Sequence, residues 1–173
     1  GASANTTTYS YTSGKVSGVT KFGSTWTYDY SNGLHITDPL SHVRWFYYLS
    51  NGELNFFWNE DGMDTIYYYC GGSDCPAGLP KSIVKNKGGS VNYAYDSRGN
   101  LTGTTLKGIP GSGVSDIVTS ATYPPACTYQ KSCNKPTSTT DGRGNVTNYS
   151  YDDTGTGALT SIKLPAASGG TRP

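Results

Sequence analysis

The sequence predicts an all-β fold built from successive antiparallel β-hairpins. The chain of 173 residues has only 34% hydrophobic residues, yet it contains 15 Tyr, 3 Trp and 4 Phe. Its 23 Gly residues, with many Ser, Thr and Asn, favour turns and strands. Helical periodicity is absent throughout. Because Tyr buries its ring while its hydroxyl stays at a polar edge, a thin two-sided sheet suits this composition better than a thick apolar core.

The clearest hairpin signal runs from Tyr93 to Thr105, in the sequence YAYDSRGNLTGTT. Tyr93 and Tyr95 fall on one face of an extended strand, because side chains alternate with a period of two. Asp96 begins a polar turn in which Gly99 can adopt a positive φ at little cost. The strand resumes at Leu101. We therefore expect a strand, a turn and a second strand.

One sequence frame recurs along the chain: a small residue, four further residues, an aromatic residue, any residue and then a tyrosine. Its aromatic pairs are Tyr28 and Tyr30, Phe46 and Tyr48, Tyr67 and Tyr69, Tyr93 and Tyr95, and Tyr149 and Tyr151. The frames begin 18, 21, 26 and 56 residues apart. A period near twenty residues fits two strands and two turns.

The repeats predict a single array over residues 1–173. Tyr9 and Tyr11 resemble the end of a further unit, so we expect about five to six hairpin units. The longer spacings predict insertions near residues 70–80 and 107–136, with residues 107–120 as the clearest loop and a short strand within residues 113–118. Neither end of the sequence reads as a natural domain edge, so we expect a piece of a longer protein.

The turns between the expected strands have suitable residues. Asn32-Gly33 and Asn51-Gly52 are the strongest short hairpin signals. The segments from Asp96 to Asn100 and from Asp152 to Gly155 take the same place in the later units.

The cysteines form two local pairs, Cys70 with Cys75 and Cys127 with Cys133. Each pair lies in a loop rich in Gly, Pro and Ser, where a short disulfide would brace an insertion. Free thiols and a metal site are the alternatives, and the absence of a C-x2-C knuckle counts against zinc. Disulfides indicate an oxidising compartment, so we expect a secreted or cell-surface protein.

Charge and hydropathy exclude several classes of partner. The net charge is +1 and charged residues are 14% of the chain, which gives no electrostatic basis for binding nucleic acid or an anionic membrane. No window resembles a membrane span, and no signal peptide is visible.

The units resemble those of the RHS, or YD-repeat, family, whose motif is approximately G-x-x-x-x-Y-x-Y-D-x-x-G-N/R-L-T followed by a D-P-L-G-like link. The resemblance is closest from Tyr93 to Thr102 and from Thr140 to Asp152, and Thr37 to Ser41 matches the link. The cysteine loop that leads into residues 134–137 also resembles bacterial members. Ser31, Leu49 and Cys70 replace the motif's aspartate, so the first three hairpins are expected to be more irregular.

The resemblance implies a curved, spiralling sheet that forms a segment of an RHS-type shell. In this family the shell encloses or carries an effector domain, often a toxin, within a large secreted or surface protein. The implied partners are neighbouring repeats of the same polypeptide, an enclosed effector and possible glycan ligands. A fragment exposes two sheet edges, which predicts edge-strand self-association.

The sequence contains no convincing catalytic or metal constellation, and we expect no cofactor and no enzyme activity. The turn aspartates are typical of Asx turns. Residues 59–64 gather three acids, Glu60, Asp61 and Asp64, without the ligand spacing of an EF-hand. A hydrolase would need two facing carboxylates, and Glu53, Glu60 and Asp64 are its only candidates outside the recurrent turns. His35 and His42 flank a turn without a recognisable nucleophile motif.

The first half of the chain is rich in aromatic residues, which supports two hypotheses. Sugars stack on exposed rings, so a carbohydrate-binding module is the alternative to a shell. Cross-strand ladders that line a shell explain the same residues. The candidate stacking residues are Trp26, Trp45, Tyr47, Tyr48 and Trp58. A glycan module predicts coplanar exposed rings, whereas a shell predicts rings packed between hairpins.

Overall fold

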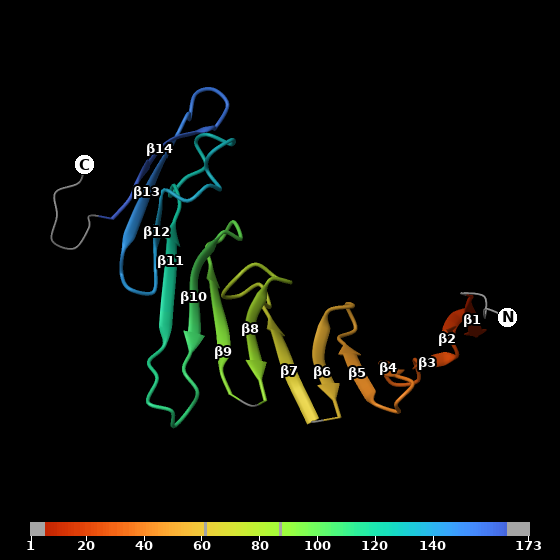
Figure 1. The fold of residues 1–173 in the computed structure, drawn as a ribbon. Coiled ribbons are helices and arrows are strands. Elements are labelled where there is room, and N and C mark those ends of the chain that lie inside the picture. The colour runs from red at the N-terminus through yellow and green to blue at the C-terminus, as the bar shows by residue number, and fades with distance from the viewer. Residues whose placement is uncertain (1–5, 61, 87, 166–173) are drawn as a thin grey trace. The chain divides into compact units, whose positions relative to one another are not determined.

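The computed structural model describes residues 6–60, 62–86 and 88–165, and these contain fourteen strands and no helix (Figure 1). The prediction of an all-β fold of successive antiparallel hairpins is confirmed. The strands are β1 (Thr7–Thr12), β2 (Lys15–Lys21), β3 (Ser24–Asp29), β4 (Leu34–Thr37), β5 (Val43–Tyr48), β6 (Leu54–Asn59), β7 (Gly62–Tyr69), β8 (Pro80–Lys85), β9 (Ser90–Tyr95), β10 (Leu101–Lys107), β11 (Ile117–Thr122), β12 (Ser138–Thr140), β13 (Val146–Tyr151) and β14 (Leu159–Lys163).

The chain divides into two compact units. The first contains residues 1–67 and 84–87, and the second contains residues 68–83 and 88–173. In the first unit, β1 to β7 pair in chain order, each strand antiparallel to the next. In the second unit, β9 to β14 do the same. The described residues contain no helix long and apolar enough to cross a membrane.

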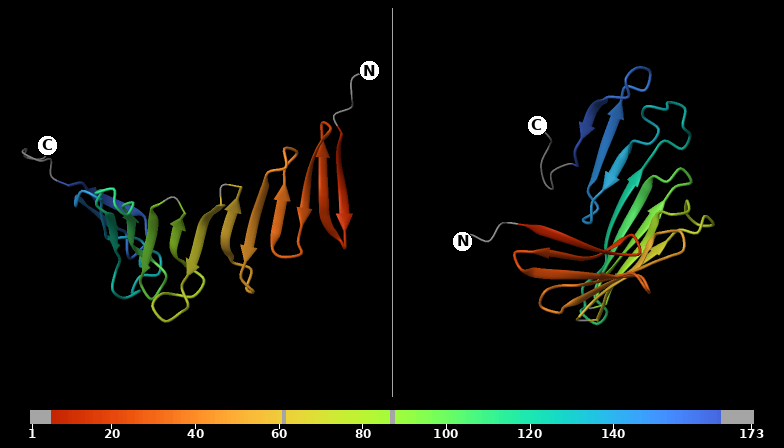
Figure 2. Two further views of the ribbon diagram at one scale, coloured as in Figure 1. Left: turned by 90° about the horizontal axis from the view of Figure 1, so that it is seen from below. Right: turned by 90° about the vertical axis from the view of Figure 1, so that its right-hand side faces the viewer.

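Each unit is a single layer of strands (Figure 2). Among the described hydrophobic residues only Cys70 and Cys133 are buried, with 4% and 2% of their surfaces exposed. Contacts between side chains on neighbouring strands therefore replace a packed core. This arrangement explains how a chain with few aliphatic residues folds, because rings such as Tyr47 and Phe56 cover each other across neighbouring strands.

A β-bulge at a tyrosine recurs in four hairpins. In β9–β10, Tyr95 pairs with Leu101 and Ala94 with Gly103, so one residue of β10 is skipped. The other three tyrosine pairs with the same bulge are Tyr11 with Val16, Tyr48 with Leu54, and Tyr151 with Leu159. The bulge places the tyrosine at the end of its strand, next to the turn.

The loop expected over residues 107–120 is shorter than predicted. β10 extends to Lys107, and the strand expected within residues 113–118 begins only at Ile117. Asp116 fixes the loop, because its carboxylate accepts hydrogen bonds from the Gly108 amide at 3.0 Å and from the Lys107 ammonium at 2.6 Å.

Candidate functional site

An aromatic cluster covers one face of β4, β5 and β6, and we call it the aromatic face. Its members are His35, Trp45, Tyr47, Phe56 and Trp58. Cross-strand pairing aligns Trp45 with Trp58 and Tyr47 with Phe56. The Tyr47 and Phe56 rings stack with centroids 4.2 Å apart, and His35 stacks on Trp45 at 4.9 Å. The rings therefore form a continuous cross-strand ladder.

The geometry of the aromatic face favours internal packing over a flat sugar platform. The Trp45 and Trp58 rings are 5.4 Å apart but tilted by 50°, so they are not coplanar. Trp58 is 38% exposed, and Trp45 and Tyr47 are half-buried. Each ring uses one side for a neighbouring ring, which leaves partial faces for a ligand.

The structure separates the other two candidate stacking residues from the aromatic face. Thr27 pairs with Thr37, and Thr37 with Val43, which places Thr27 on the same face as Trp45. Trp26, one residue earlier, therefore lies on the opposite face, where it pairs with Val19. Tyr48 alternates with Tyr47 and is 50% exposed at the bulge.

An aspartate-centred turn recurs at the ends of hairpins. In residues 96–100, the Asp96 amide donates to the Asn100 carbonyl, and the Gly99 amide donates to the Asp96 carbonyl, both at 3.0 Å. The Asp96 carboxylate also accepts from the amides of Arg98 and Asn100 at 2.9 Å. Gly99 has a φ of 85°, which explains the glycine of the motif.

The same backbone pattern occurs in residues 38–42, 49–53 and 141–145. The turn at Leu49 was expected to be irregular because it lacks the aspartate, but it keeps both backbone hydrogen bonds. Asn51 supplies the missing acceptor, since its Oδ1 accepts from the Glu53 amide at 3.1 Å. The substitution therefore changes the side chain that holds the turn and leaves the turn itself intact.

Hydrogen bonds keep the turn carboxylates ionised. At Asp141, the side-chain amide of Asn145, followed by the amides of Asn145 and Arg143, lowers the pKa of the carboxyl. At Asp96, partial burial acts to raise the pKa, but the hydrogen bonds from Asn100 and Arg98 outweigh it and the pKa is lowered. These carboxylates are structural acceptors and are poorly suited to act as general acids.

Three tyrosine hydroxyls donate to a backbone carbonyl at the start of the preceding strand or just before it, and we call these contacts tyrosine latches. Tyr95, at the end of β9, donates to the Pro80 carbonyl at the start of β8 at 2.9 Å. Tyr151, at the end of β13, donates to the Pro136 carbonyl just before β12 at 3.0 Å. Tyr123, just after β11, donates to the Leu101 carbonyl at the start of β10 at 3.1 Å.

Burial, and then the neighbouring tyrosines, raise the pKa of Tyr95 and Tyr151. Both phenols therefore remain protonated and can act as donors at neutral pH. Tyr95 and Tyr151, two tyrosines of the recurring sequence frame, thus have a specific physical role that the sequence pattern did not reveal.

Both cysteine pairs are joined as disulfides, which fits the local pairing expected from their spacing. The second disulfide, Cys127–Cys133, braces a loop that packs on the turn after β13. Within that loop, Lys131 donates to the Gly155 carbonyl at 2.9 Å and Ser132 donates to the Asp153 carboxylate at 2.5 Å. Ser132 is only 3% exposed. The disulfide therefore positions polar side chains that hold the turn.

Among the described side chains, the carboxylates and imidazoles do not assemble a catalytic group. Glu53 accepts a hydrogen bond from Asn51, and His42 Nδ1 lies 3.0 Å from the Asp38 carboxylate and 3.9 Å from that of Glu60. Neither histidine has a serine or cysteine partner among the described residues. The proposed acid cluster is only partly visible, because Asp61 and the side chain of Asp64 lie outside the described residues. No metal-binding group of three His, Cys, Asp or Glu occurs in the described ranges.

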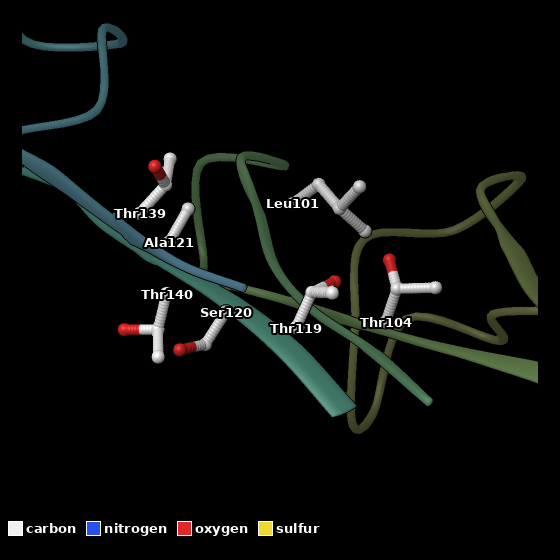
Figure 3. Close-up of a pocket in the computed structure, with 8 residues that line it drawn as sticks. Leu101, Thr104, Thr119, Ser120, Ala121, Thr139 and Thr140 are labelled. Carbon is white, nitrogen blue, oxygen red and sulfur yellow. The ribbon is translucent and has the colours of Figure 1, made fainter. Parts of the chain in front are cut away.

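A shallow pocket of about 180 Å³ lies over β10, β11 and β12 (Figure 3). Its lining is Leu101, Gly103, Thr104, Thr119, Ser120, Ala121, Thr139 and Thr140. None of these residues carries a charge, an imidazole or a thiol, so the lining has no base that could activate its serine and threonine hydroxyls as nucleophiles.

Comparison with known proteins adds information on the fold. No family model and no curated protein matches the chain. Among solved structures, the crystal structure of TcdB2-TccC3-Cdc42 is similar, with a TM-score of 0.66 and 12% identity over 95% of this chain. The structure of TcdB2-TccC3-TEV is similar over the same share, with a TM-score of 0.65 and 12% identity. The match spans 9% of each of those chains, and at this identity it shows a shared fold alone.

Proposed function

We propose that the chain is a non-enzymatic structural repeat module, part of the β-shell of a large secreted or surface protein of the RHS type that encloses or carries an effector domain. The observation that carries this proposal is the repeated use of polar side chains to hold strands and turns. Tyr95 and Tyr151 make equivalent latches, each to a proline carbonyl 15 residues earlier. Asp96 and Asp141 make equivalent turns.

The wider features support an extracytoplasmic scaffold. Two disulfides brace surface loops, which is typical of oxidising compartments. In the two similar structures, the matching fold is a small part of a much longer chain. The proposal likewise makes this chain one module of a longer polypeptide. Single-layer hairpins gain stability from their neighbours along the sheet, so they suit a repeat array.

The structural role is tested by removing the latch hydroxyls. We expect Tyr95→Phe and Tyr151→Phe each to lower the free energy of unfolding by about 1 kcal/mol, because each loses one hydrogen bond and leaves a carbonyl less satisfied. Tyr129→Phe is the matched control, since Tyr129 is 46% exposed in the disulfide loop. Urea unfolding followed by far-UV circular dichroism measures the difference. Equal free energies of unfolding for the wild type and all three variants would contradict the proposal.

The shell role is tested on the intact polypeptide that contains this chain. Under limited proteolysis, we expect sequence enclosed by the array to survive longer than the same sequence expressed without the array. Equal cleavage rates would leave the module as a scaffold that encloses nothing.

A carbohydrate-binding module is the second candidate, supported by the partial exposure of Trp58 on the aromatic face. A glycan array probed with the purified chain separates the two functions. The shell proposal predicts no saturable binding at high micromolar concentration. Binding that is lost in a Trp45→Ala, Trp58→Ala double variant would favour the glycan module, provided circular dichroism shows that the variant is folded.

A further inference from the structure

Two turns of the first unit contain the dipeptide Asn-Gly, whose residues can react with each other. Asn32-Gly33 lies between β3 and β4, and Asn51-Gly52 lies between β5 and β6. In such a dipeptide the backbone nitrogen of glycine can attack the side-chain amide carbon of asparagine, because glycine has no side chain to shield its own amide. The two dipeptides are identical in sequence, so any difference in their reactivity comes from their surroundings.

Three hydrogen bonds restrain the second dipeptide. Asn51 Nδ2 donates to the Glu53 carboxylate at 2.9 Å, and Asn51 Oδ1 accepts from the Glu53 amide at 3.1 Å. The Gly52 amide donates to the Leu49 carbonyl at 2.9 Å. Attack by the Gly52 nitrogen on the Asn51 side chain therefore requires both groups to give up their hydrogen bonds first.

The first dipeptide has neither restraint. Asn32 is exposed, and its side-chain amide has no hydrogen-bond partner in the described part of the chain. The Gly33 amide likewise donates to no acceptor within residues 6–60, 62–86 and 88–165. The Asn32 side chain can therefore rotate toward the Gly33 nitrogen without breaking a hydrogen bond.

A histidine donates to the peptide unit that joins Asn32 to Gly33. His35 Nε2 lies 3.0 Å from the Asn32 carbonyl oxygen, and because a carbonyl only accepts, Nε2 carries the proton of this hydrogen bond. Asp29 lies 3.7 Å from the other ring nitrogen, and the ring stacks on Trp45 at 4.9 Å, so its orientation is fixed. When the Gly33 nitrogen loses its proton, negative charge develops on the carbonyl oxygen of the same peptide unit. A donor already placed at that oxygen stabilises this charge.

We propose that Asn32 is a site of spontaneous deamidation promoted by His35, and that the turn at Asn51 is protected from the same reaction. The Gly33 nitrogen gives its proton to solvent and bonds to the side-chain carbonyl carbon of Asn32. The bond from that carbon to the side-chain nitrogen then breaks, and this nitrogen takes a proton from water and leaves as ammonia. The product is a cyclic succinimide. Addition of a water molecule to either of its carbonyls opens the ring to aspartate or isoaspartate at position 32.

The products change the turn between β3 and β4 in charge and in shape. Both add a negative charge to the turn that follows Asp29 and contacts His35 of the aromatic face. Isoaspartate also lengthens the main chain, because the chain then continues through the former side chain. Gly33 has little room to adapt, since a β-carbon at this position would lie 2.7 Å from the Phe46 carbonyl oxygen. This inference goes beyond the proposed structural role and does not depend on it.

Incubation of the folded 173-residue chain at neutral pH, followed by peptide mapping with mass spectrometry, tests the proposal. Conversion of the amide to a carboxylate changes the peptide mass, and chromatography separates isoaspartate from aspartate. Asn32→Asp supplies the aspartate standard. We expect the initial rate at position 32 to exceed that at position 51 about tenfold or more, because the second turn must first lose three hydrogen bonds.

The same comparison in urea is the internal control, because unfolding removes the contacts of both turns and should bring the two rates within about twofold of each other. His35→Phe keeps a ring beside Trp45 but removes the donor. It should slow the reaction at position 32 about fivefold and leave position 51 unchanged, with circular dichroism used to verify folding.

Two results would overturn the inference. Equal rates at positions 32 and 51 in the folded wild type would show that the second turn gives no protection, and this comparison needs no variant. An unchanged rate at position 32 in folded His35→Phe would remove the histidine from the reaction. Neither result affects the loss of stability expected for Tyr95→Phe, so failure of this inference is distinguishable from failure of the proposed function.

Discussion

Removal of the Asp96 carboxylate should open the turn between β9 and β10. Asp96→Ala deletes the acceptor for the Arg98 amide, the Asn100 amide and the Asn100 side chain, at 2.9, 2.9 and 2.8 Å. It also deletes an ion pair with Arg98 at 3.3 Å. The Asp96 side chain is only 24% exposed, so water replaces these contacts incompletely.

The expected cost is about 2 kcal/mol, from three hydrogen bonds worth about 0.5–1 kcal/mol each and an ion pair that adds little. This corresponds to a roughly thirtyfold increase in the opening equilibrium of the turn. The stability of Asp96→Asn should lie between those of the wild type and Asp96→Ala, because the amide oxygen still accepts hydrogen bonds from the backbone while the charge is lost.

Hydrogen–deuterium exchange with mass spectrometry measures this opening directly in peptides that cover residues 93–105. Asp141→Ala is the matched control, because Asp141 accepts the same three hydrogen bonds in an exposed turn. Solvent can replace its acceptor, so exchange at residues 143–145 should increase much less. Equal increases at the two turns, or no increase at residues 98–100, would refute the argument that partial burial makes the Asp96 turn more costly to disrupt.

Three further predictions concern other parts of the chain. Because hydrogen bonds lower the pKa of Asp141 from its usual 3.8, this carboxylate contributes its full stabilisation above pH 3.8. The contribution should disappear as the pH falls through the lowered pKa, and urea unfolding midpoints measured across this range would show the loss. A midpoint that does not change on acidification would contradict this prediction. Reduction of Cys127–Cys133 should accelerate amide exchange at residues 155–157 more than at residues 143–145, and equal acceleration would argue against a bracing role. Ser41→Gly should raise the free energy of unfolding by about 0.5–1 kcal/mol, since Ser41 has a φ of 70° where three equivalent turns have glycine; a lower urea midpoint would contradict this.

The distribution of polar contacts bears on what the module can do. Its turn carboxylates, three of its tyrosine hydroxyls and its disulfide loops are occupied in holding strands and turns. Side chains committed in this way are fixed in orientation, which suits a rigid wall. The aromatic face is a surface whose rings keep partly exposed sides.

The sequence alone determined the strands and turns whose chemistry is local. Tyrosine alternation identified β9 and β13, and the Asp-x-x-Gly-Asn pattern located their turns, because alternation and positive φ depend on the residues themselves. The hairpin turns at Ser13-Gly14 and Phe22-Gly23 were missed. A phenylalanine with a φ of 52° is not a recognised turn signal, because a bulky side chain rarely adopts a positive φ.

Which distant residues pair with each other depends on the tertiary structure. The sequence marked Tyr95 and Tyr151 as repeat residues, but their bonds to Pro80 and Pro136 depend on strand register. Likewise, Trp26, Trp45 and Trp58 looked equivalent as candidate stacking residues. Pairing through β4 placed Trp26 on the opposite face from the other two. Because a shift of one residue reverses every side chain of a strand, the composition of the aromatic face and the partners of the latches follow from register, which local sequence does not encode.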